Sequence, residues 1–208
     1  KLKTFYEKLG LLNTSRINLN EKTKPILPIK WGKIETATLS FGHGLSISPI
    51  QMVEAAAKLF NNNQTFTTQI HKKEQVSLKE AKKFLSENTI NTLKQLMYEN
   101  TIIGTAKKAR LDGFNIGGKT ATGEKAVKGK YDKTKLVSSF LAVFPIESPN
   151  DISLVLFDEP SIGNIKKFRQ GATGGLTAAP VTADIFKRIF PILGITKNYN
   201  LDPGLFVN

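Results

Sequence analysis

The chain has 208 residues, of which 40% are hydrophobic, and it carries a formal net charge of +13 and no cysteine. Its length fits one domain or a large part of one, and the lack of cysteine excludes disulfides and thiolate metal sites. The only histidines are His43 and His71, far apart in sequence, so a histidine-based metal site is not expected. The sequence shows neither a signal peptide nor an apolar run near ~18 residues, so it predicts no membrane-spanning segment.

The positive charge comes almost entirely from lysine. Only Arg16, Arg110, Arg169 and Arg188 are arginines among the 30 basic residues. Bidentate recognition of phosphates and bases favours arginine, whereas scattered lysine is typical of a solvated surface. We therefore expect no nucleic-acid partner.

The first part of the chain predicts a helix followed by a long irregular connection. Residues 3–12 are expected to be helical near a C-terminal Gly10, because glycine commonly ends helices. The side chains expected to be buried there are Phe5, Leu9 and Leu12. Residues 13–33 contain no periodic pattern and are predicted to form a loop, and loops of that length are often functional.

A histidine between two glycines comes next, followed by a clear helix start. Gly42 and Gly44 flank His43, and the segment fits a tight turn in the core as well as a loop that lines a cleft. Ser48-Pro-Ile-Gln51 combines a serine N-cap, a proline at the first helical position and a glutamine that can complete a capping box. This helix is predicted to end at Phe60 and to bury Ile50, Val53, Ala57 and Phe60.

The middle of the chain predicts a weak hairpin and two more helices. Residues 64–75 alternate weakly, as a short exposed hairpin would. A second capping box, at residues 77–80, opens a lysine-rich helix that ends at Leu85. Ser86 is the expected cap of the next helix, whose apolar stripe consists of Ile90, Leu93 and Met97.

The second half predicts three strands and a closing helix. The strands are expected at about residues 114–122, 136–144 and 151–157. Residues 145–150 are too few for a crossover helix, so the last two strands should form an antiparallel hairpin. The helix is expected at residues 176–190, packed on the sheet through Val181, Ile185, Ile189 and the aromatic residues between them. The predicted fold class is therefore α+β, with an antiparallel sheet flanked by helices.

The segment Gly113–Glu124 carries the clearest chemistry, and two readings fit it. Gly113–Thr120 matches the phosphate-binding P-loop pattern, for which Asp158 at the end of an apolar strand could hold magnesium. Lys119-Thr-Ala-Thr122 comes close to the Lys-Thr-Gly strand element of penicillin-recognising enzymes. The charged residues before Gly113 and the glycines after Thr120 disfavour the strand and helix that a P-loop needs, but short motifs alone leave the choice open.

Longer segments resemble one protein family. Residues 31–51, 117–125 and 174–181 are similar to the transpeptidase domain of class B penicillin-binding proteins, most closely the septal, FtsI type. The resemblance spans most of the chain at compatible spacing. It implies the penicillin-binding transpeptidase and β-lactamase-like fold, and a peptidoglycan D,D-transpeptidase that joins D-Ala-D-Ala stem peptides through a serine acyl-enzyme, without metal or cofactor.

The resemblance also implies roles for individual residues. Lys119 would supply positive charge and a hydrogen bond beside the nucleophile, and the backbone N–H of Thr122 would donate to the oxyanion. The hydroxyls of Thr120 and Thr122 would bind the terminal carboxylate of the substrate. Ala121 and His43 would line the substrate site, although Ala121 stands where the family has glycine and His43 where it commonly has tyrosine.

One family motif has no counterpart in this sequence. No serine in the 208 residues is followed by lysine three places later. We therefore expect residues 1–208 to be the C-terminal portion of a single transpeptidase domain, incomplete at its N-terminal side because the nucleophile-bearing portion is absent. The implied partners are peptidoglycan stem peptides, β-lactams and membrane proteins of the divisome, and the implied location is the periplasmic side of the bacterial inner membrane, through an N-terminal anchor outside this sequence. A non-catalytic scaffold that binds divisome partners or glycan is the remaining alternative.

Overall fold

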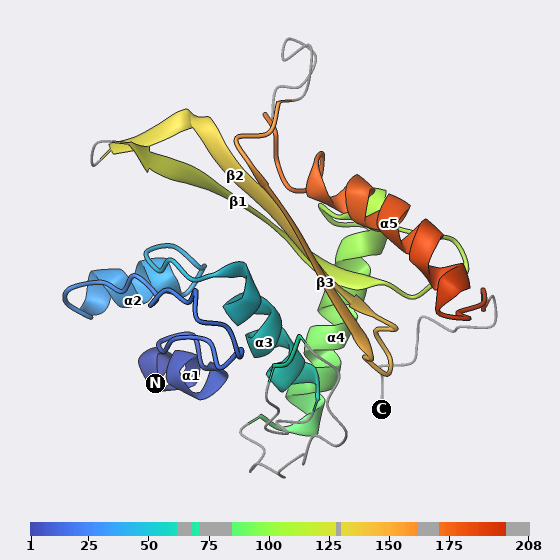
Figure 1. Cartoon of the computed structure of the whole chain (residues 1–208), viewed down its shortest axis with the longest axis horizontal. Helices are drawn as coiled ribbons and strands as arrows, with labels where there is room; N and C mark the ends of the chain where they lie inside the picture. Colours follow the sequence, from blue (N-terminus) through green and yellow to red (C-terminus); the bar gives the residue numbers. More distant parts are fainter. Residues whose placement is uncertain (62–67, 71–84, 128–129, 162–170, 199–208) are drawn as a thin grey trace. The chain divides into compact units, whose positions relative to one another are not determined.

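The computed structural model describes residues 1–61, 68–70, 85–127, 130–161 and 171–198 (Figure 1). These residues form two compact units, Lys1–Ser86 and Glu87–Asn208. The predicted hairpin at residues 64–75 and the predicted helix at residues 77–85 fall almost entirely outside the described residues. No helix of the described part of the chain is long and apolar enough to cross a membrane.

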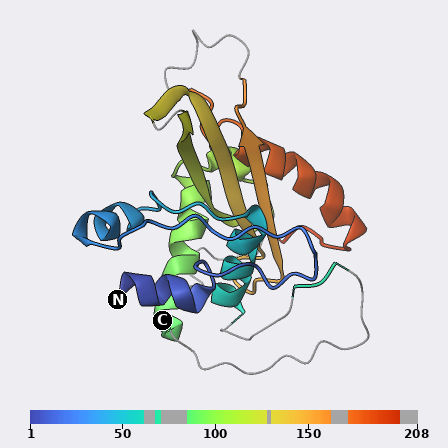
Figure 2. The same ribbon diagram turned by 60° about the vertical axis from the view of Figure 1, so that its left-hand side comes forward.

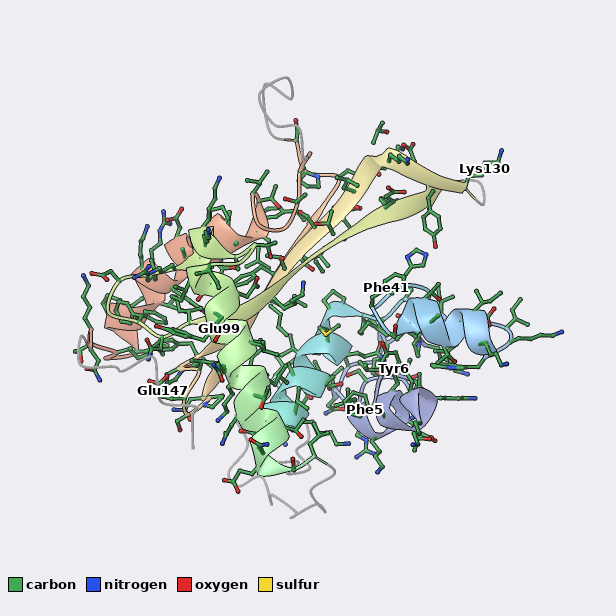
Figure 3. All side chains as sticks on the ribbon, turned by 180° about the vertical axis from the view of Figure 1, so that it is seen from behind. Phe5, Tyr6, Phe41, Glu99, Lys130 and Glu147 are labelled. Carbon is green, nitrogen blue, oxygen red and sulfur yellow. The ribbon has the colours of Figure 1, made fainter. Side chains whose placement is uncertain are left out.

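The described residues of the first unit form three helices: α1 (Leu2–Leu9), α2 (Lys33–Leu39) and α3 (Pro49–Phe60). Helix α1 ends as predicted at Gly10, whose φ of 86° is left-handed. The buried side chain of this region is Leu11, not Leu12. Tyr6, labelled in Figure 3, donates a hydrogen bond to the carbonyl of Leu39 at 2.5 Å, which ties α1 to the end of α2.

Helix α3 begins at the predicted capping box but buries a different face. The Gln51 side chain accepts a hydrogen bond from the Ser48 N–H at 3.0 Å and donates to the Asn13 carbonyl at 2.6 Å. These partners allow Gln51 to be only 2% exposed. The buried face consists of Gln51, Ala55, Ala56 and Phe60, so the expectation for Ile50, Val53 and Ala57 was wrong.

The second unit contains a three-stranded antiparallel sheet with the order β1 (Gly117–Val127), β2 (Lys130–Phe144) and β3 (Asp151–Asp158). The predicted α+β class and the antiparallel pairing of the last two strands are confirmed. Strand β1 begins three residues later than expected and continues past the expected turn to Val127. Its register against β2 shifts between Glu124 and Lys125.

In the described part of this unit, two helices and a short 3-10 turn pack on the sheet: α4 (Glu87–Ile102), η1 (Lys107–Ala109) and α5 (Ala178–Ile192). Figures 1 and 2 show α5 lying along the sheet, and α4 contacts β1. The core between α5 and the sheet contains stacked rings, with Phe190 centred 4.3 Å from Phe144 and 4.8 Å from Phe186. The aromatic part of the predicted α5 face is therefore confirmed, whereas Val181 and Ile185 are each 36% exposed.

A hydrogen bond connects the turn between β2 and β3 to α4. Glu147, labelled in Figure 3, lies in this turn, and its carbonyl accepts a hydrogen bond from Lys94 Nζ at 3.0 Å. Burial lowers the pKa of Lys94 below its usual value, against the opposing effect of the Glu147 and Glu87 carboxylates. The contact joins the hairpin to the helix that leads into β1.

Candidate active site

Strand β1 places Lys119, Ala121 and Thr122 at the margin of the sheet. Within the described residues β1 pairs with β2 alone, through neighbours such as Lys119 with Leu141 and Thr122 with Ser138. The backbone groups on its other side are therefore not used by a further strand of the described part of the chain. An edge of this kind can pair with an extended peptide-like ligand.

Alternation along the strand separates the predicted site residues into two sets. Lys119 and Ala121 lie on one face, and both are exposed. The Lys119 ammonium donates to the carbonyl of Thr120 at 2.5 Å, a contact within its own strand. The Ala121 methyl group projects from the same face of the sheet as Lys119. It therefore does not occupy the space beside the strand, in the plane of the sheet, where a pairing ligand would lie.

The two threonines on the opposite face differ in their surroundings. Thr120 is 8% exposed, and its hydroxyl lies 2.7 Å from the hydroxyl of Thr105. Thr122 is exposed, and its hydroxyl oxygen accepts a hydrogen bond from the Gly174 N–H at 3.1 Å. The structure thus keeps both side chains near the start of α5 but leaves only Thr122 open to solvent.

Two glycines before Lys119 permit close packing of the sheet. A Cβ on Gly117 would lie 2.5 Å from Cδ1 of Ile146, and one on Gly118 would lie 2.3 Å from Cζ of Phe140. Real Cβ atoms do not approach other atoms so closely, so a side chain at Gly117 would have to displace Ile146, and one at Gly118 would also meet the Leu141 carbonyl oxygen at 2.6 Å. The glycines of this motif therefore serve strand packing.

This arrangement overturns the P-loop alternative. Lys119 lies inside an antiparallel strand, and no helix begins at Thr120, where a phosphate would need the N-terminus of a helix. Asp158, the residue expected to hold magnesium, instead pairs with Lys125 at 3.0 Å. The hypothesis of a nucleotide hydrolase built on Gly113–Thr120 is wrong.

Glycines also allow the segment before α5 to approach β1. A Cβ on Gly174 would lie 2.3 Å from the Ser139 carbonyl oxygen and 2.7 Å from that of Ala121, and one on Gly175 would lie 2.3 Å from the Thr105 carbonyl oxygen. The hydroxyl of Thr177 adds a hydrogen bond to Ser138 on β2, at 2.6 Å. The segment is thereby held directly over the face that carries the threonines.

Asn100 and Thr105, which the sequence did not single out, make hydrogen bonds to the first residues of β1. The Asn100 amide donates to the Gly118 carbonyl at 2.8 Å and accepts from the N–H of Thr105 at 3.0 Å. The neighbouring Thr101 hydroxyl donates to the Ile116 carbonyl at 2.8 Å. These contacts tie the last turn of α4 to the start of β1, and no periodicity or short motif marks such pairs in advance.

His43, the remaining predicted site residue, belongs to the first unit. Its ring is stacked near that of Phe41, with centroids 6.4 Å apart, and the residue is exposed. The structure does not test its contact with substrate, which stays a prediction.

Comparison with known proteins identifies the family to which this edge strand belongs. Residues 1–187 match the family model described as the penicillin binding protein transpeptidase domain. A probable peptidoglycan D,D-transpeptidase FtsI from Caulobacter vibrioides is 35% identical over 97% of this chain and 35% of its own length. Stage V sporulation protein D from Bacillus subtilis is 30% identical over 96% of the chain and 32% of its own length. The chain thus spans about a third of these curated relatives.

Solved structures agree with this assignment. The transpeptidase domain of penicillin-binding protein 3 from Burkholderia pseudomallei superposes with a TM-score of 0.81 at 25% identity, over 97% of this chain and 59% of that one. The fold is also shared with penicillin-binding protein 3 from Mycobacterium tuberculosis, solved with ampicillin, at a TM-score of 0.75 and 20% identity over 97% of this chain and 47% of that one. This chain belongs to the family of penicillin-binding protein transpeptidase domains.

Proposed function

We propose that the chain is the C-terminal part of the catalytic domain of a peptidoglycan D,D-transpeptidase. The observation that carries the proposal is strand β1, which sets an exposed lysine and an exposed threonine, Lys119 and Thr122, along a sheet edge that no further strand of the described residues covers. An extended D-Ala-D-Ala stem peptide has the backbone groups that such an edge can bind. Membership of the transpeptidase family and the named function of the Caulobacter relative support it.

The proposed chemistry has two steps. A serine oxygen attacks the carbonyl carbon of the penultimate D-alanine, an ester bond forms, and the terminal D-alanine leaves with its amine protonated. The amine of a second stem peptide then attacks the ester carbonyl, which forms the cross-linking amide and returns the proton to the serine. Both steps build negative charge on the carbonyl oxygen, where preorganised donors are most effective.

Residues of this chain would act at defined points of both steps. Lys119 places its ammonium on the open face of β1, where it would stabilise negative charge beside the serine. The Thr122 N–H would donate to the oxyanion, and the Thr122 hydroxyl would bind the terminal carboxylate. Ala121 and His43 would contact the acyl donor, with the methyl of Ala121 restricting which side chains it can carry.

The nucleophile would come from outside the 208 residues, since none of their serines has lysine three places later. We propose that it lies on a preceding part of the same domain. β-Lactams would acylate the same serine, and an ampicillin complex is known for a structural neighbour. The same proposal places the domain on the periplasmic side of the inner membrane, with divisome membrane proteins as partners.

Acylation of the intact protein tests this function. Incubation with benzylpenicillin is expected to add the mass of one penicillin, and peptide mapping should find it on a serine followed three residues later by lysine, outside residues 1–208. Hydrolysed penicillin, which lacks the reactive ring, is the control and should add nothing. An intact protein that carries such a serine but remains unmodified would point to the non-catalytic scaffold instead.

A further inference from the structure

A cavity of about 420 Å³ lies in the second unit, at the end of the sheet where β1 begins and β2 turns into β3. Its walls come from residues 113–115, from residues 144–151 and from residues 193–198, which follow α5. The residues assigned to the candidate active site, all within the described part of the chain, are not among those that line it. Small-molecule sites usually have volumes of about 300–1,000 Å³, so the cavity is large enough for a ligand of its own.

Backbone hydrogen bonds join the three walls of the cavity. The Ile146 N–H donates to the Asn115 carbonyl at 3.0 Å, which connects the turn between β2 and β3 to the segment before β1. The Asn198 N–H donates to the Gly113 carbonyl at 2.9 Å, which connects that segment to the residues after α5. The protein therefore forms the cavity without help from a ligand, as is usual for small-molecule sites.

The charge of the lining is opposite to the charge of the chain. The sequence has 30 basic and 17 acidic residues, whereas the described residues that line the cavity include Glu147 and Asp151 but no lysine or arginine. Neither carboxylate forms an ion pair with a described residue. A cleft lined by charges of one sign concentrates ions of the opposite sign. This cavity is therefore expected to attract cations although the chain as a whole is positive.

One oxygen of Glu147, the residue labelled in Figure 3, lacks a hydrogen-bond donor among the described residues. This oxygen, Oε2, is buried. The neighbouring Lys94 ammonium donates to the main-chain carbonyl of Glu147 at 3.0 Å and not to its carboxylate. A buried carboxylate oxygen without a donor is unfavourable, because the hydration lost on burial is not replaced. A ligand that brings a charged donor would remove this cost.

Much of the remaining lining is apolar and consists of Phe114, Phe144, Pro145, Leu193 and Ile195. The ring centroids of Phe114 and Phe144 are 6.1 Å apart, and aromatic rings attract cations as well as apolar groups. The described residues contain no group of three histidine or acidic side chains that could hold a metal ion. The combination of carboxylates and apolar surface therefore fits an organic cation better than an inorganic one.

We propose that this cavity binds a small organic cation, an ammonium group attached to an apolar or aromatic group. The ammonium pairs with the carboxylates of Glu147 and Asp151 and supplies Glu147 Oε2 with a donor. The apolar group lies against Phe114 and Phe144. The site is separate from the candidate active site, and the proposal does not rest on the transpeptidase function.

Benzylamine and benzyl alcohol are the probes for this site, because they have nearly the same shape but only benzylamine is positively charged at neutral pH. Isothermal titration of the intact protein measures the dissociation constant of each probe. The wild type is compared with Glu147→Gln and Asp151→Asn, which each remove one charge and keep the shape of the side chain. Asp184→Asn is the matched control, since Asp184 is exposed on α5 and pairs there with Lys187 at 3.1 Å.

The charge of the probe and the charge of the cavity should both determine the affinity. The wild type is expected to bind benzylamine with a Kd of about 1 mM or lower, which is ordinary for so small a ligand, and benzyl alcohol about tenfold more weakly or worse. Glu147→Gln should weaken benzylamine binding about tenfold or more, the loss expected for a hydrogen bond to a charged group, and Asp151→Asn by a smaller factor. Neither substitution should change the binding of benzyl alcohol, and Asp184→Asn should bind both probes as the wild type does.

Thermal unfolding verifies that each variant is folded. Glu147→Gln should be at least as stable as the wild type, because a neutral amide costs less to bury than a carboxylate. If that variant nevertheless fails to fold, Asp151→Asn and the comparison of the two probes still decide the question.

Two results would overturn the proposal. The first is that benzylamine binds no more tightly than benzyl alcohol, or does not bind at millimolar concentrations. The second is that Glu147→Gln and Asp151→Asn bind benzylamine as tightly as the wild type, which would place the ammonium elsewhere. Since neither result bears on the acylation of a serine by benzylpenicillin, failure of this proposal is distinguishable from failure of the transpeptidase function.

Discussion

Replacing Lys119 with alanine is expected to reduce acylation of the intact protein by benzylpenicillin on the order of 10²–10³-fold. This is the loss typical of removing one preorganised group that stabilises a developing oxyanion. The fold should not change, because the Lys119 side chain is exposed and its hydrogen bond, among the described residues, is to the carbonyl of the next residue, Thr120. The rate constant, measured with a fluorescent penicillin, checks the effect.

Lys125→Ala is the matched control for Lys119→Ala. Lys125 lies on the same strand and pairs with Asp158 at 3.0 Å and Glu159 at 2.8 Å, contacts that are exposed and contribute little to stability. Removal of this lysine should leave the acylation rate within about twofold of the wild type, since exposed charges at a distance are screened by salt. Equal losses in the two variants would mean that the lysines act through general charge, and an unchanged rate in Lys119→Ala would refute its assigned role.

Gly118→Ala is expected to destabilise the second unit by about 3 kcal/mol or more, above the usual cost of adding one methyl group to a packed core. The new Cβ would lie 2.3 Å from Phe140 Cζ and 2.6 Å from the Leu141 carbonyl oxygen. Phe140 is completely buried in the core, and the carbonyl belongs to the partner strand, so neither can move aside cheaply. Urea unfolding of the intact protein measures the change in the unfolding free energy.

Gly123→Ala provides the contrast within the same strand. No heavy atom lies within 4 Å of a Cβ built on Gly123, and its φ is outside the left-handed range. Alanine at such a site should leave stability unchanged or raise it by about 0.4–1 kcal/mol, because it reduces the conformational entropy of the unfolded chain. If the two variants were equally stable, Gly118 would not be a packing requirement, and the structure of β1 would be in error.

The sequence was sufficient for those parts of the fold that local physics determines. The six-residue connection 145–150 excluded a crossover between β2 and β3, and the capping box at Ser48 fixed the start of α3. Helix α2 was missed because its N-cap is Gly32, which has no side chain to signal a cap. Its Glu35 carboxylate instead accepts from the Gly32 N–H at 2.9 Å, a bond that only the structure reveals.

The buried faces of helices were harder to predict than the helices themselves. Periodicity favoured Ile50 and Val53 in α3, but Gln51 is buried because Asn13, far away in sequence, supplies its partner. In α5 the rings of Phe186 and Phe190 lie beside Phe144 of the sheet, and Ile189 packs against the same core. Val181 and Ile185 of the predicted face are each 36% exposed. Such choices depend on tertiary neighbours that no local pattern contains.

In the candidate site, too, some features follow from local sequence and others depend on tertiary contacts. Lys119 and the strand that carries it followed from the sequence, together with the family resemblance. The hydrogen bonds that Asn100 and Thr105 make to β1 did not, because they join residues 15 to 18 positions apart that share no motif with the strand. The motif assigns the same role to Thr120, which is 8% exposed, and to Thr122, which is exposed. These roles stay predictions.

A crystal structure of the intact protein acylated by benzylpenicillin would show whether β1 binds the acyl donor along its edge. We expect the acyl group to lie along the edge of β1 opposite β2, with its carboxylate within hydrogen-bonding distance of the Thr122 hydroxyl and the Lys119 ammonium beside the modified serine. An acyl group bound away from residues 119–122, or a carboxylate held by residues of another element, would contradict it.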